Sequence, residues 1–481
     1  MRSNRRDFIR KFAAGSTVLA TGIPAWAATT ASSDDEIHRS LQQEQAAARF
    51  NMCGYAAPKL EVVRVGIIGL GQRGSDAVER LSYIDGLEIV ALCDKYPDRV
   101  AAAQKTLAKM GRPKAKEYSG EEGWKALCDS NDIDLIYSPT PWHLHTPIAV
   151  RAMLNGKHAA IEVPAAKTMD ECWELVETSE KTKRHCMMLE NCCYDFFELL
   201  TLNMARQGLL GDIVHAEGAY IHDLTRDWLF NKNAYADMWR LKENIGHNGS
   251  LYPTHGLGPV AQCMNINRGD KFDHLVSMST ADFTMNKLAA ELAAKDEFFQ
   301  PYTNQPYRGN MNTTLIRSNA GKTIMIQHDV STLRPYSRIH LVSGTKGAAQ
   351  KWPGPERIAF GHSWIKKEEL DALYKKYAPP IVNHIGAIAK EVGGHGGMDF
   401  IMDWRLIDCL RNGLPLDQDV YDAAAWSCLV PLSQRSVAKK SRTVDIPDFT
   451  RGNWQSNKPV DLTLNGGATT GVRTIKPALK M

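Results

Sequence analysis

A glycine motif between two apolar segments most constrains how this chain can fold. Residues 62–68 are apolar and run directly into residues 69–74, which read GLGQRG and match the pattern G-x-G-x-x-G. A helical pattern follows over 75–84, and a second apolar segment over 87–93 ends at Asp94, about 20 residues after the last glycine. This order of strand, glycine turn, helix, strand and acid predicts a dinucleotide-binding βαβ unit.

Each element of the motif has a physical task. Gly69 permits a tight turn, Gly71 lets a pyrophosphate approach the backbone, and Gly74 allows the helix to pack closely on the strand. The N-terminus of that helix would face the phosphates. Asp94 can accept hydrogen bonds from both ribose hydroxyls and would repel a 2′-phosphate, which favours NAD, although Lys95 beside it leaves NADP open. The competing interpretation is a plain βα turn with a surface acid.

The alternation of strands and helices continues to residue 194. Helical patterns over 97–110, 123–129, 146–154 and 168–181 separate apolar segments over 133–138, 158–161 and 186–189. They predict an α/β domain over 59–194, a Rossmann fold with a doubly wound parallel sheet. A proline-rich loop over 139–147 follows one strand at the edge where such sheets bind ligands. We expect its central residues to border the nicotinamide, or its histidines to stabilise the loop: Trp142, His143, Leu144 and His145.

The second half has a different rhythm. Strand patterns over 213–220, 275–282, 314–317, 323–331 and 338–343 are separated by long connections, and helical patterns follow over 398–410 and 421–439. They predict an α+β domain over 195–454 with a mainly antiparallel open sheet, one face of which covers the nicotinamide, followed by a surface tail over 455–481. Tyr252 and His255, held by Pro253 and nearby glycines, form a pair suited to proton transfer or to ordinary hydrogen bonding.

The N-terminus carries an export signal. Paired arginines at Arg5 and Arg6, a short apolar run over 12–23 and the small-residue site 25–27 predict a twin-arginine signal over 1–27 and a periplasmic protein, followed by a polar linker over 28–58. The partner implied is the twin-arginine export machinery. Because such proteins fold in a reducing compartment, the ten cysteines are expected to be free, buried thiols without a metal.

Composition excludes two classes of partner. Hydrophobic residues make up 43% and charged residues 23% of the 481 residues, as in ordinary globular proteins. The net charge is +4, and no stretch of the chain after the signal concentrates lysine and arginine, which argues against nucleic acid. No later segment has the roughly 20 apolar residues of a membrane helix, which argues against a membrane anchor.

The order and spacing of several motifs along the chain resemble those of a known family. The spacing of the glycine motif, Asp94, the proline-rich loop and residues 162–164 resembles the Gfo/Idh/MocA oxidoreductase-like family, in which Val163 would typically be lysine. Over about 59–454, distinctive blocks look like glycoside hydrolase family 109, the NAD-dependent α-N-acetylgalactosaminidases: EVPA at 162–165, ENCCY at 190–194, EGAY at 217–220, YPTHGLGP at 252–259 and GGHGGMD at 393–399.

The resemblance implies one tightly bound NAD per chain and a glycan or glycoside substrate. It implies cofactor contacts at Gln72, Arg73, Asp94, Trp142, His145, Glu162, Val163, Asn191 and Tyr252. It implies sugar contacts at Tyr220, Arg240, Tyr252, Pro253, Thr254, His255 and Tyr336, of which Tyr220 alone would suggest a core aromatic and Arg240 a surface ion pair. The catalytic residues implied are Tyr252, His255 and Glu162, and a homodimer is possible.

The implied reaction is hydrolysis through transient oxidation. Hydride leaves sugar C3 for the nicotinamide, a base removes the acidified C2 proton, the aglycone leaves C1, water adds, and the hydride returns. Such a cycle needs no exchange of NAD outside the cell. The alternatives are a net sugar oxidoreductase with tightly bound NAD, against which Val163 argues, and a non-catalytic sugar-binding protein that keeps NAD.

Overall fold

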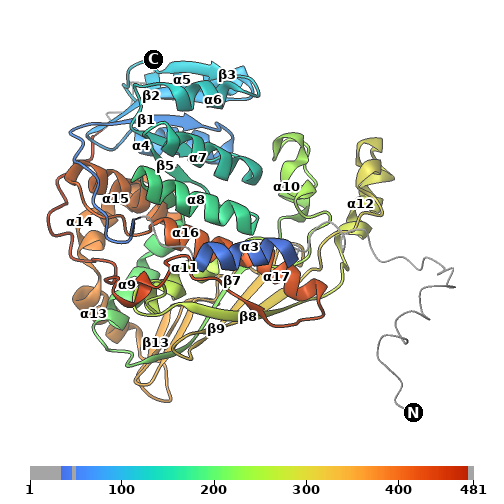
Figure 1. The fold of residues 1–481 in the computed structure, drawn as a ribbon, viewed down its shortest axis with the longest axis vertical. Helices are drawn as coiled ribbons and strands as arrows, with labels where there is room; N and C mark the ends of the chain where they lie inside the picture. Colours follow the sequence, from blue (N-terminus) through green and yellow to red (C-terminus); the bar gives the residue numbers. More distant parts are fainter. Residues whose placement is uncertain (1–33, 46–49, 475–481) are drawn as a thin grey trace, which may run out of the picture.

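Two β-sheets organise the chain, one parallel and one mainly antiparallel (Figure 1). The structure is a computed structural model that describes residues 34–45 and 50–474. The predicted export signal over 1–27 lies outside the described residues.

The first sheet has the predicted doubly wound architecture. Its strand order is β3-β2-β1-β4-β5-β6 and all neighbouring strands are parallel. The strands are β1 (Val63–Ile68), β2 (Leu87–Asp94), β3 (Lys116–Ser119), β4 (Leu135–Ser138), β5 (His158–Ile161) and β6 (Cys186–Met188). The helices between them are α4 (Gln72–Leu81), α5 (Pro97–Lys109), α6 (Gly123–Asp129), α7 (His145–Leu154) and α8 (Met169–Thr182). Edge strand β3 was not predicted because its four residues are mostly exposed and show no apolar pattern.

The second sheet has eight strands in the order β13-β12-β11-β7-β10-β9-β8-β14. Only the β7–β10 pair is parallel, so the sheet is mainly antiparallel as predicted. Its strands are β7 (Ile213–Ile221), β8 (Phe272–Ser279), β9 (Asn312–Ser318), β10 (Thr323–Asp329), β11 (Leu341–Gly344), β12 (Ala348–Gln350), β13 (Arg357–Ala359) and β14 (Val444–Asp445). The strand predicted over 338–343 begins only at Leu341, because Ile339 and His340 have positive φ and interrupt the extended chain.

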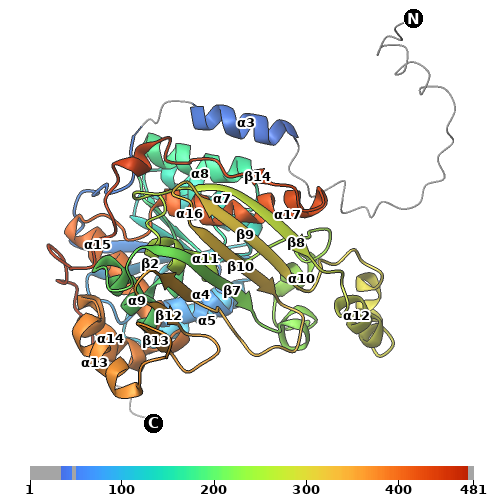
Figure 2. The same ribbon diagram turned by 90° about the horizontal axis from the view of Figure 1, so that it is seen from below.

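Helices cover one face of this sheet. Helix α11 (Thr254–Cys263) packs on β7 and helix α17 (Leu429–Ala438) on β8, and α9 (Phe196–Arg206) packs against α11. Helices α15 (Met398–Asn412) and α16 (Val420–Ser427) pack against the first domain, α15 on α4 and β1 and α16 on α8 and β6. Seen from below, none of the described helices lies in front of β7, β9 or β10 (Figure 2). The prediction of a single helix over 421–439 is wrong, because Cys428 separates α16 from α17. Pro431 lies three residues further on and lacks the N–H group that a continuous helix would need. The remaining helices are α3 (Asp34–Gln45), α10 (Trp239–Lys242), α12 (Met285–Ala293), α13 (Lys367–Tyr377) and α14 (Pro380–Val392).

The described parts of the predicted linker and tail pack on the folded body. Helix α3 lies within the predicted linker, and its Ser40 accepts a 2.8 Å hydrogen bond from the indole of Trp173 on α8. In the tail, the Trp404 indole of α15 donates to the Thr470 carbonyl at 2.9 Å. The linker is therefore partly helical, which the polar sequence alone did not indicate.

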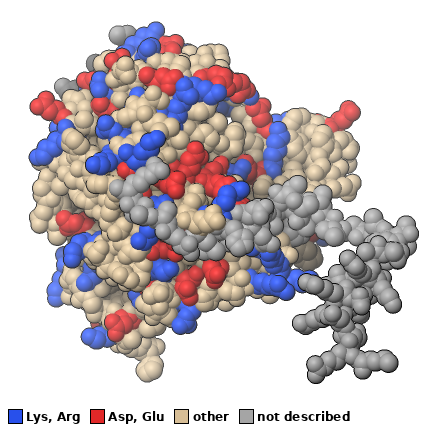
Figure 3. Space-filling view, in the orientation of Figure 1, with Lys and Arg blue, Asp and Glu red and all other residues tan. Residues whose placement is uncertain are grey.

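The distribution of charged side chains and the state of the cysteines agree with what the composition indicates. On the face in Figure 3, basic side chains are scattered among acidic ones. All ten cysteines are free, and nine of them are buried as predicted. Among the described helices, none is long and apolar enough to cross a membrane.

Two glycines set how closely α11 approaches β7. A Cβ added at Gly218 of β7 would lie 2.2 Å from the Gly256 carbonyl oxygen, and one added at Gly256 would lie 2.2 Å from the Ala219 nitrogen. Helix and strand therefore touch through their backbones. This contact places the start of α11, with Tyr252 just before it and His255 in its first turn, beside Tyr220 of β7.

We expect Gly218→Ala to lower the free energy of unfolding by about 1–3 kcal/mol, because backbone atoms cannot yield to the new methyl group. The matched control is Gly361→Ala, where an added Cβ meets no atom within 4 Å. That change should stay within about 0.5 kcal/mol of the original chain in urea unfolding. If both variants lost the same amount of unfolding free energy, the close contact between β7 and α11 would be contradicted.

Candidate active site

A cavity of about 420 Å³ lies between the two sheets. On one side it is lined by the carboxyl ends of the parallel strands and the loops that follow them, which is where open α/β sheets bind ligands. On the other side it is lined by aromatic and basic residues of the second half. The predicted site residues that line it are Gly69, Gly71, Gln72, Arg73, Asp94, Trp142, His143, Leu144, His145, Glu162, Val163, Asn191, Tyr220, Arg240, Tyr252 and His255.

The glycine turn has the backbone that a dinucleotide requires. Gly69 has φ +95°, which only glycine adopts readily, and its N–H donates to the Cys93 carbonyl at 2.8 Å. At the end of β2, the Asp94 carboxylate accepts hydrogen bonds from the backbone N–H groups of Leu70 at 2.7 Å and Tyr96 at 2.9 Å. The acid is thereby aimed at the cavity mouth beside the N-terminus of α4, and these residues fit NAD.

The other two glycines have different duties. A Cβ at Gly74 would lie 1.9 Å from the Gly69 carbonyl oxygen, so Gly74 is needed for packing of α4 on the turn. A Cβ at Gly71 would meet only the Arg99 guanidinium at 3.6 Å, an ordinary contact. Gly71 therefore leaves space over the N-terminus of α4 that the fold itself does not use.

Because Gly74 is crowded and Gly71 is not, substitutions at these two glycines can distinguish an effect on folding from an effect on cofactor binding. We expect Gly74→Ala to lower the thermal unfolding temperature, because two backbone segments would have to part. Gly71→Ala should keep that temperature and weaken NAD binding about tenfold or more in calorimetric titration, because the methyl group occupies the space for the pyrophosphate. A Gly71→Ala chain that binds NAD as tightly as the original would contradict this role.

An ion cluster centres on the partly buried Arg73. Its guanidinium donates to Glu162 Oε1 at 2.6 and 2.9 Å and to Asp399 Oδ2 at 2.8 Å. The amide of Asn191 donates to the other Asp399 oxygen at 2.5 Å, and His395 Nδ1 lies 2.9 Å from Asp399. Burial disfavours the charged form of Arg73, but the two carboxylates outweigh it and raise its pKa well above the ordinary value. Arg73, a predicted cofactor contact, thus also ties β5 to α15.

Asp399 makes this cluster sensitive to acid. Burial raises its pKa, but Arg73, the hydrogen bond with His395 and Arg80 together hold it well below its usual range. The folded state therefore favours the ionised carboxylate, which contributes stability at neutral pH. That contribution is lost as the pH falls through the ordinary value near 4 toward the lower folded value.

We expect Asp399→Asn to lower the unfolding free energy by about 1–3 kcal/mol at pH 7, because Arg73 and Arg80 lose one carboxylate partner and keep only Glu162 and Asp403. The difference in unfolding free energy between the variant and the original chain should become smaller below about pH 4, because Asp399 of the original chain also takes up a proton there. Denaturant unfolding at both pH values measures it. The control Asp129→Asn, which breaks an exposed pair with Arg151, should cost no more than about 1 kcal/mol. A gap that is independent of pH would refute the ionisation argument.

Some residues of the proline-rich loop stabilise the loop itself, and others line the cavity. Trp142 is buried and stacks on Tyr252, with ring centroids 5.8 Å apart. His145 is fully buried, and its ring nitrogens lie 2.7 Å from the Pro164 carbonyl and 2.8 Å from the Thr140 carbonyl. Burial lowers the pKa of His145. His145 therefore holds the loop against the end of β5, while the exposed His143 faces the cavity.

The second-half wall is aromatic and carries one cation. The Tyr220 and Tyr252 rings lie 4.7 Å apart, and the Arg240 guanidinium lies over Tyr252 at 5.1 Å and over Trp142 at 5.5 Å. Arg240 also donates to the Tyr235 hydroxyl at 2.8 Å. Burial lowers the pKa of Arg240, but the surrounding tyrosines outweigh it and raise the value. A fixed cation among aromatic faces suits a polar ligand with apolar faces.

Tyr252, His255 and Glu190 form a line of hydrogen-bonding groups. The Tyr252 hydroxyl lies 3.4 Å from His255 Nε2, and His255 Nδ1 lies 2.7 Å from Glu190 Oε1. Burial raises the pKa of Glu190, but His255 outweighs it and lowers the value, so the buried carboxylate stays ionised. With its proton on Nδ1, His255 donates to this carboxylate and presents Nε2 as an acceptor. Burial raises the pKa of Tyr252 well above its ordinary value, which keeps the phenol protonated.

Four predicted site residues do not line this cavity. Gly74 packs below the turn, and Pro253 and Thr254 begin α11. Tyr336 stands beyond Tyr220, with ring centroids 6.3 Å apart. The structure brings the other predicted residues together.

Two buried acids of the site were missed. Glu190 directly follows β6 at the ligand-binding edge of the sheet, a position that could have signalled it. Asp399 ends the glycine-rich block at 393–399, whose run of glycines marks an unusual backbone. Glu190, Cys192 and His255 place donor atoms within 4.8 Å of one another. Burial raises the pKa of the Cys192 thiol well above its ordinary value, which disfavours the thiolate that a metal needs.

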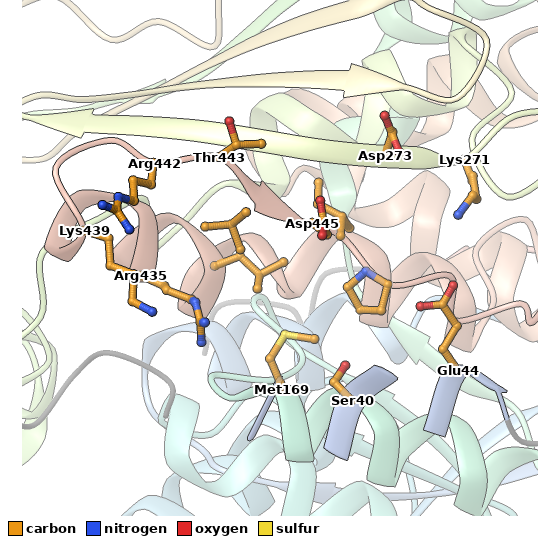
Figure 4. A pocket seen from close by; sticks show the side chains of 14 residues that line it. Ser40, Glu44, Met169, Lys271, Asp273, Arg435, Lys439, Arg442, Thr443 and Asp445 are labelled. Carbon is orange, nitrogen blue, oxygen red and sulfur yellow. The ribbon is translucent and has the colours of Figure 1, made fainter. Parts of the chain in front are cut away.

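Another cavity lies away from these residues. It has a volume of about 370 Å³ and lies where α3, α17 and β8 meet, with Ser40, Glu44, Lys271 and Arg435 among its lining residues (Figure 4). It contains none of the predicted site residues. The predicted site residues instead gather in the cavity between the sheets.

Comparison with known proteins agrees with this fold and site. Residues 63–190 match the model of the oxidoreductase family with an NAD-binding Rossmann fold, and residues 194–456 match the C-terminal domain of glycosyl hydrolase 109. A levoglucosan dehydrogenase in complex with NADH has a similar fold, with a TM-score of 0.61 and 18% identity over 80% of this chain and 99% of that chain. The chain is thus a two-sheet protein with an NAD-binding Rossmann domain.

Relatives identify the family more narrowly. A glycosyl hydrolase family 109 protein of Bacteroides fragilis strain YCH46 is 49% identical over 429 residues, 86% of this chain and 90% of that protein. A B. fragilis protein named alpha-N-acetylgalactosaminidase is 49% identical over 411 residues, 84% of this chain and 96% of that protein. The chain belongs to glycosyl hydrolase family 109.

Proposed function

We propose that this glycoside hydrolase removes terminal α-linked N-acetylgalactosamine by transient oxidation at C3, elimination across C1 and C2, and addition of water. The observation that carries the proposal is the Tyr252–His255–Glu190 line at the wall opposite the NAD-binding turn. The similarity to a protein named alpha-N-acetylgalactosaminidase supports the choice of sugar. Bound NAD would supply a hydride acceptor for C3 and return the hydride at the end of the cycle.

The residues of the line divide the proton transfers. His255, oriented by Glu190, accepts a proton at Nε2, and Tyr252 donates one from its hydroxyl. Removal of the C2 proton next to the C3 carbonyl and protonation of the departing oxygen at C1 are the two transfers that elimination needs. Glu162 holds Arg73, and Arg240 with Tyr220 orients the sugar. The pair of carboxylates that flanks the bond in most glycosidases is not required.

The proposal extends to location. The arginine pair at residues 5 and 6 and the small-residue site at 25–27 support export by the twin-arginine machinery to the periplasm. A cycle that returns its hydride needs no external pool of NAD. The chemistry and the proposed compartment are therefore compatible.

The test is hydrolysis of p-nitrophenyl α-N-acetylgalactosaminide in D2O without added NAD. We expect release of p-nitrophenol together with deuterium at C2 of the sugar, because elimination exchanges that proton with solvent. Tyr252→Phe should lower the rate about 10²–10⁴-fold, the usual contribution of a positioned acid or base. Release without C2 deuterium would show direct displacement instead.

A matched variant separates chemistry from folding. Tyr118→Phe removes a hydroxyl from edge strand β3, away from the cavity lining, and should leave the rate unchanged. If Tyr252→Phe also turned over normally, the role of the line in proton transfer would be refuted. Thermal unfolding of both variants shows whether either is misfolded.

A further inference from the structure

A second cavity, of about 880 Å³, adjoins the active-site cavity. His395 lines both cavities, and Tyr336 of the second lies 5.1 Å from the ring of His222, which lines the first. Its walls come from the start of α9, the chain around β11 and β12, helix α14 and the glycine-rich block before α15. No step of the proposed reaction uses this space.

The wall of the second cavity combines aromatic rings with compensated charge. Trp352 packs edge-on against Tyr336, with ring centroids 5.3 Å apart, and the guanidinium of Arg338 lies 5.5 Å from the Trp352 ring. Ion pairs join Asp195 to both Arg338 and Lys351. In and directly behind the wall, three basic residues are balanced by three acidic ones. The basic residues are Arg338, Lys351 and Lys390, and the acidic residues are Asp195, Glu198 and Glu356.

This chemistry suits a neutral saccharide. A nucleotide or other phosphate ligand calls for an excess of cationic groups, which the balanced wall does not provide. A pyranose ring presents C–H faces that pack on aromatic rings and hydroxyl groups that hydrogen bond to polar side chains. The wall offers both, and Trp352 contacts Tyr336 and Arg338, which is itself held by ion pairs with Asp195 and Glu198.

We propose that the second cavity binds the saccharide unit attached to the sugar that is released, and that Trp352 is its stacking platform. The inference rests on the proposed function, since it places the aglycone of that reaction. A saccharide linked at C1 has to leave the first cavity, and the second meets it at Tyr336 and His395. Trp352 lines only the second cavity, so it can be changed without touching the catalytic line.

The test compares two substrates that share the terminal sugar. One is methyl α-N-acetylgalactosaminide, whose aglycone is a single carbon, and the other is a trisaccharide that ends in α-N-acetylgalactosamine. We expect Trp352→Ala to lower kcat/KM for the trisaccharide about tenfold and to leave the methyl glycoside within about twofold. Trp352→Phe, which keeps an aromatic face, should restore most of the loss.

A control comes from the same part of the sheet. Trp364 is 44% exposed and does not line the cavity, so Trp364→Ala should change neither substrate. Thermal unfolding verifies that each variant is folded. If Trp352→Ala affected both substrates equally or neither of them, the second cavity would not be an aglycone site.

Direct binding distinguishes failure of this inference from failure of the proposed reaction. In calorimetric titration the NAD-loaded Tyr252→Phe chain, in which turnover is slow, should bind the trisaccharide more tightly than the methyl glycoside, and adding Trp352→Ala to this variant should abolish the difference. Cleavage without any such difference overturns the second site alone. A difference without cleavage overturns the proposed reaction and keeps the site.

Discussion

The ion pairs of Arg73 with Glu162 and Asp399 are the interaction on which the site depends. They join the first turn of α4, the residue after β5 and the first turn of α15, which are separated by up to 326 residues in the chain. Buried charges are stable only when they are paired and hydrogen bonded. A displacement of any one of these elements would leave a charge without compensation. The dinucleotide turn and the second half of the chain are thus held at a fixed distance, with the cavity between them.

Burial then sets the properties of the opposite wall. Tyr252 is covered by Trp142, Tyr220 and Arg240, so the hydroxyl that faces His255 has little contact with water. Hydrogen bonds and charges act more strongly in such surroundings than in solvent. Glu190 is the group that makes this arrangement directional, because an acceptor at Nδ1 leaves His255 one free acceptor nitrogen. The backbone contact of Gly218 with Gly256 keeps these groups beside the sheet.

The sequence predicted those parts of the structure that depend on local patterns. The βαβ motif, the parallel sheet and the mainly antiparallel sheet follow from apolar periodicity and glycine spacing. The helical pattern over 168–181 corresponds to α8, which begins with a capping box of Thr168 and Glu171. Strands β12, β13 and β14 have two or three residues, too few for a pattern to be visible. Pairs such as Glu190 with His255 are 65 residues apart, and only tertiary packing brings them together. Arg73 could be placed in the motif, but its partner Asp399 could not be inferred from spacing.

Val163 shows why the second half has to supply the proton chemistry. The lysine typical of the larger family would place an ammonium at this position, beside the cofactor turn, whereas Val163 is 2% exposed and offers no titratable group. Glu162 next to it is engaged by Arg73. Neither residue at this position is free to exchange a proton with a sugar hydroxyl, and the proposed transfers pass to Tyr252 and His255, with Glu190 of the first half orienting His255. In the proposed cycle the dinucleotide is held at the first sheet, while Tyr252 and His255 come from the chain beside the second sheet, so both transfers operate only when the ion cluster holds the two halves together.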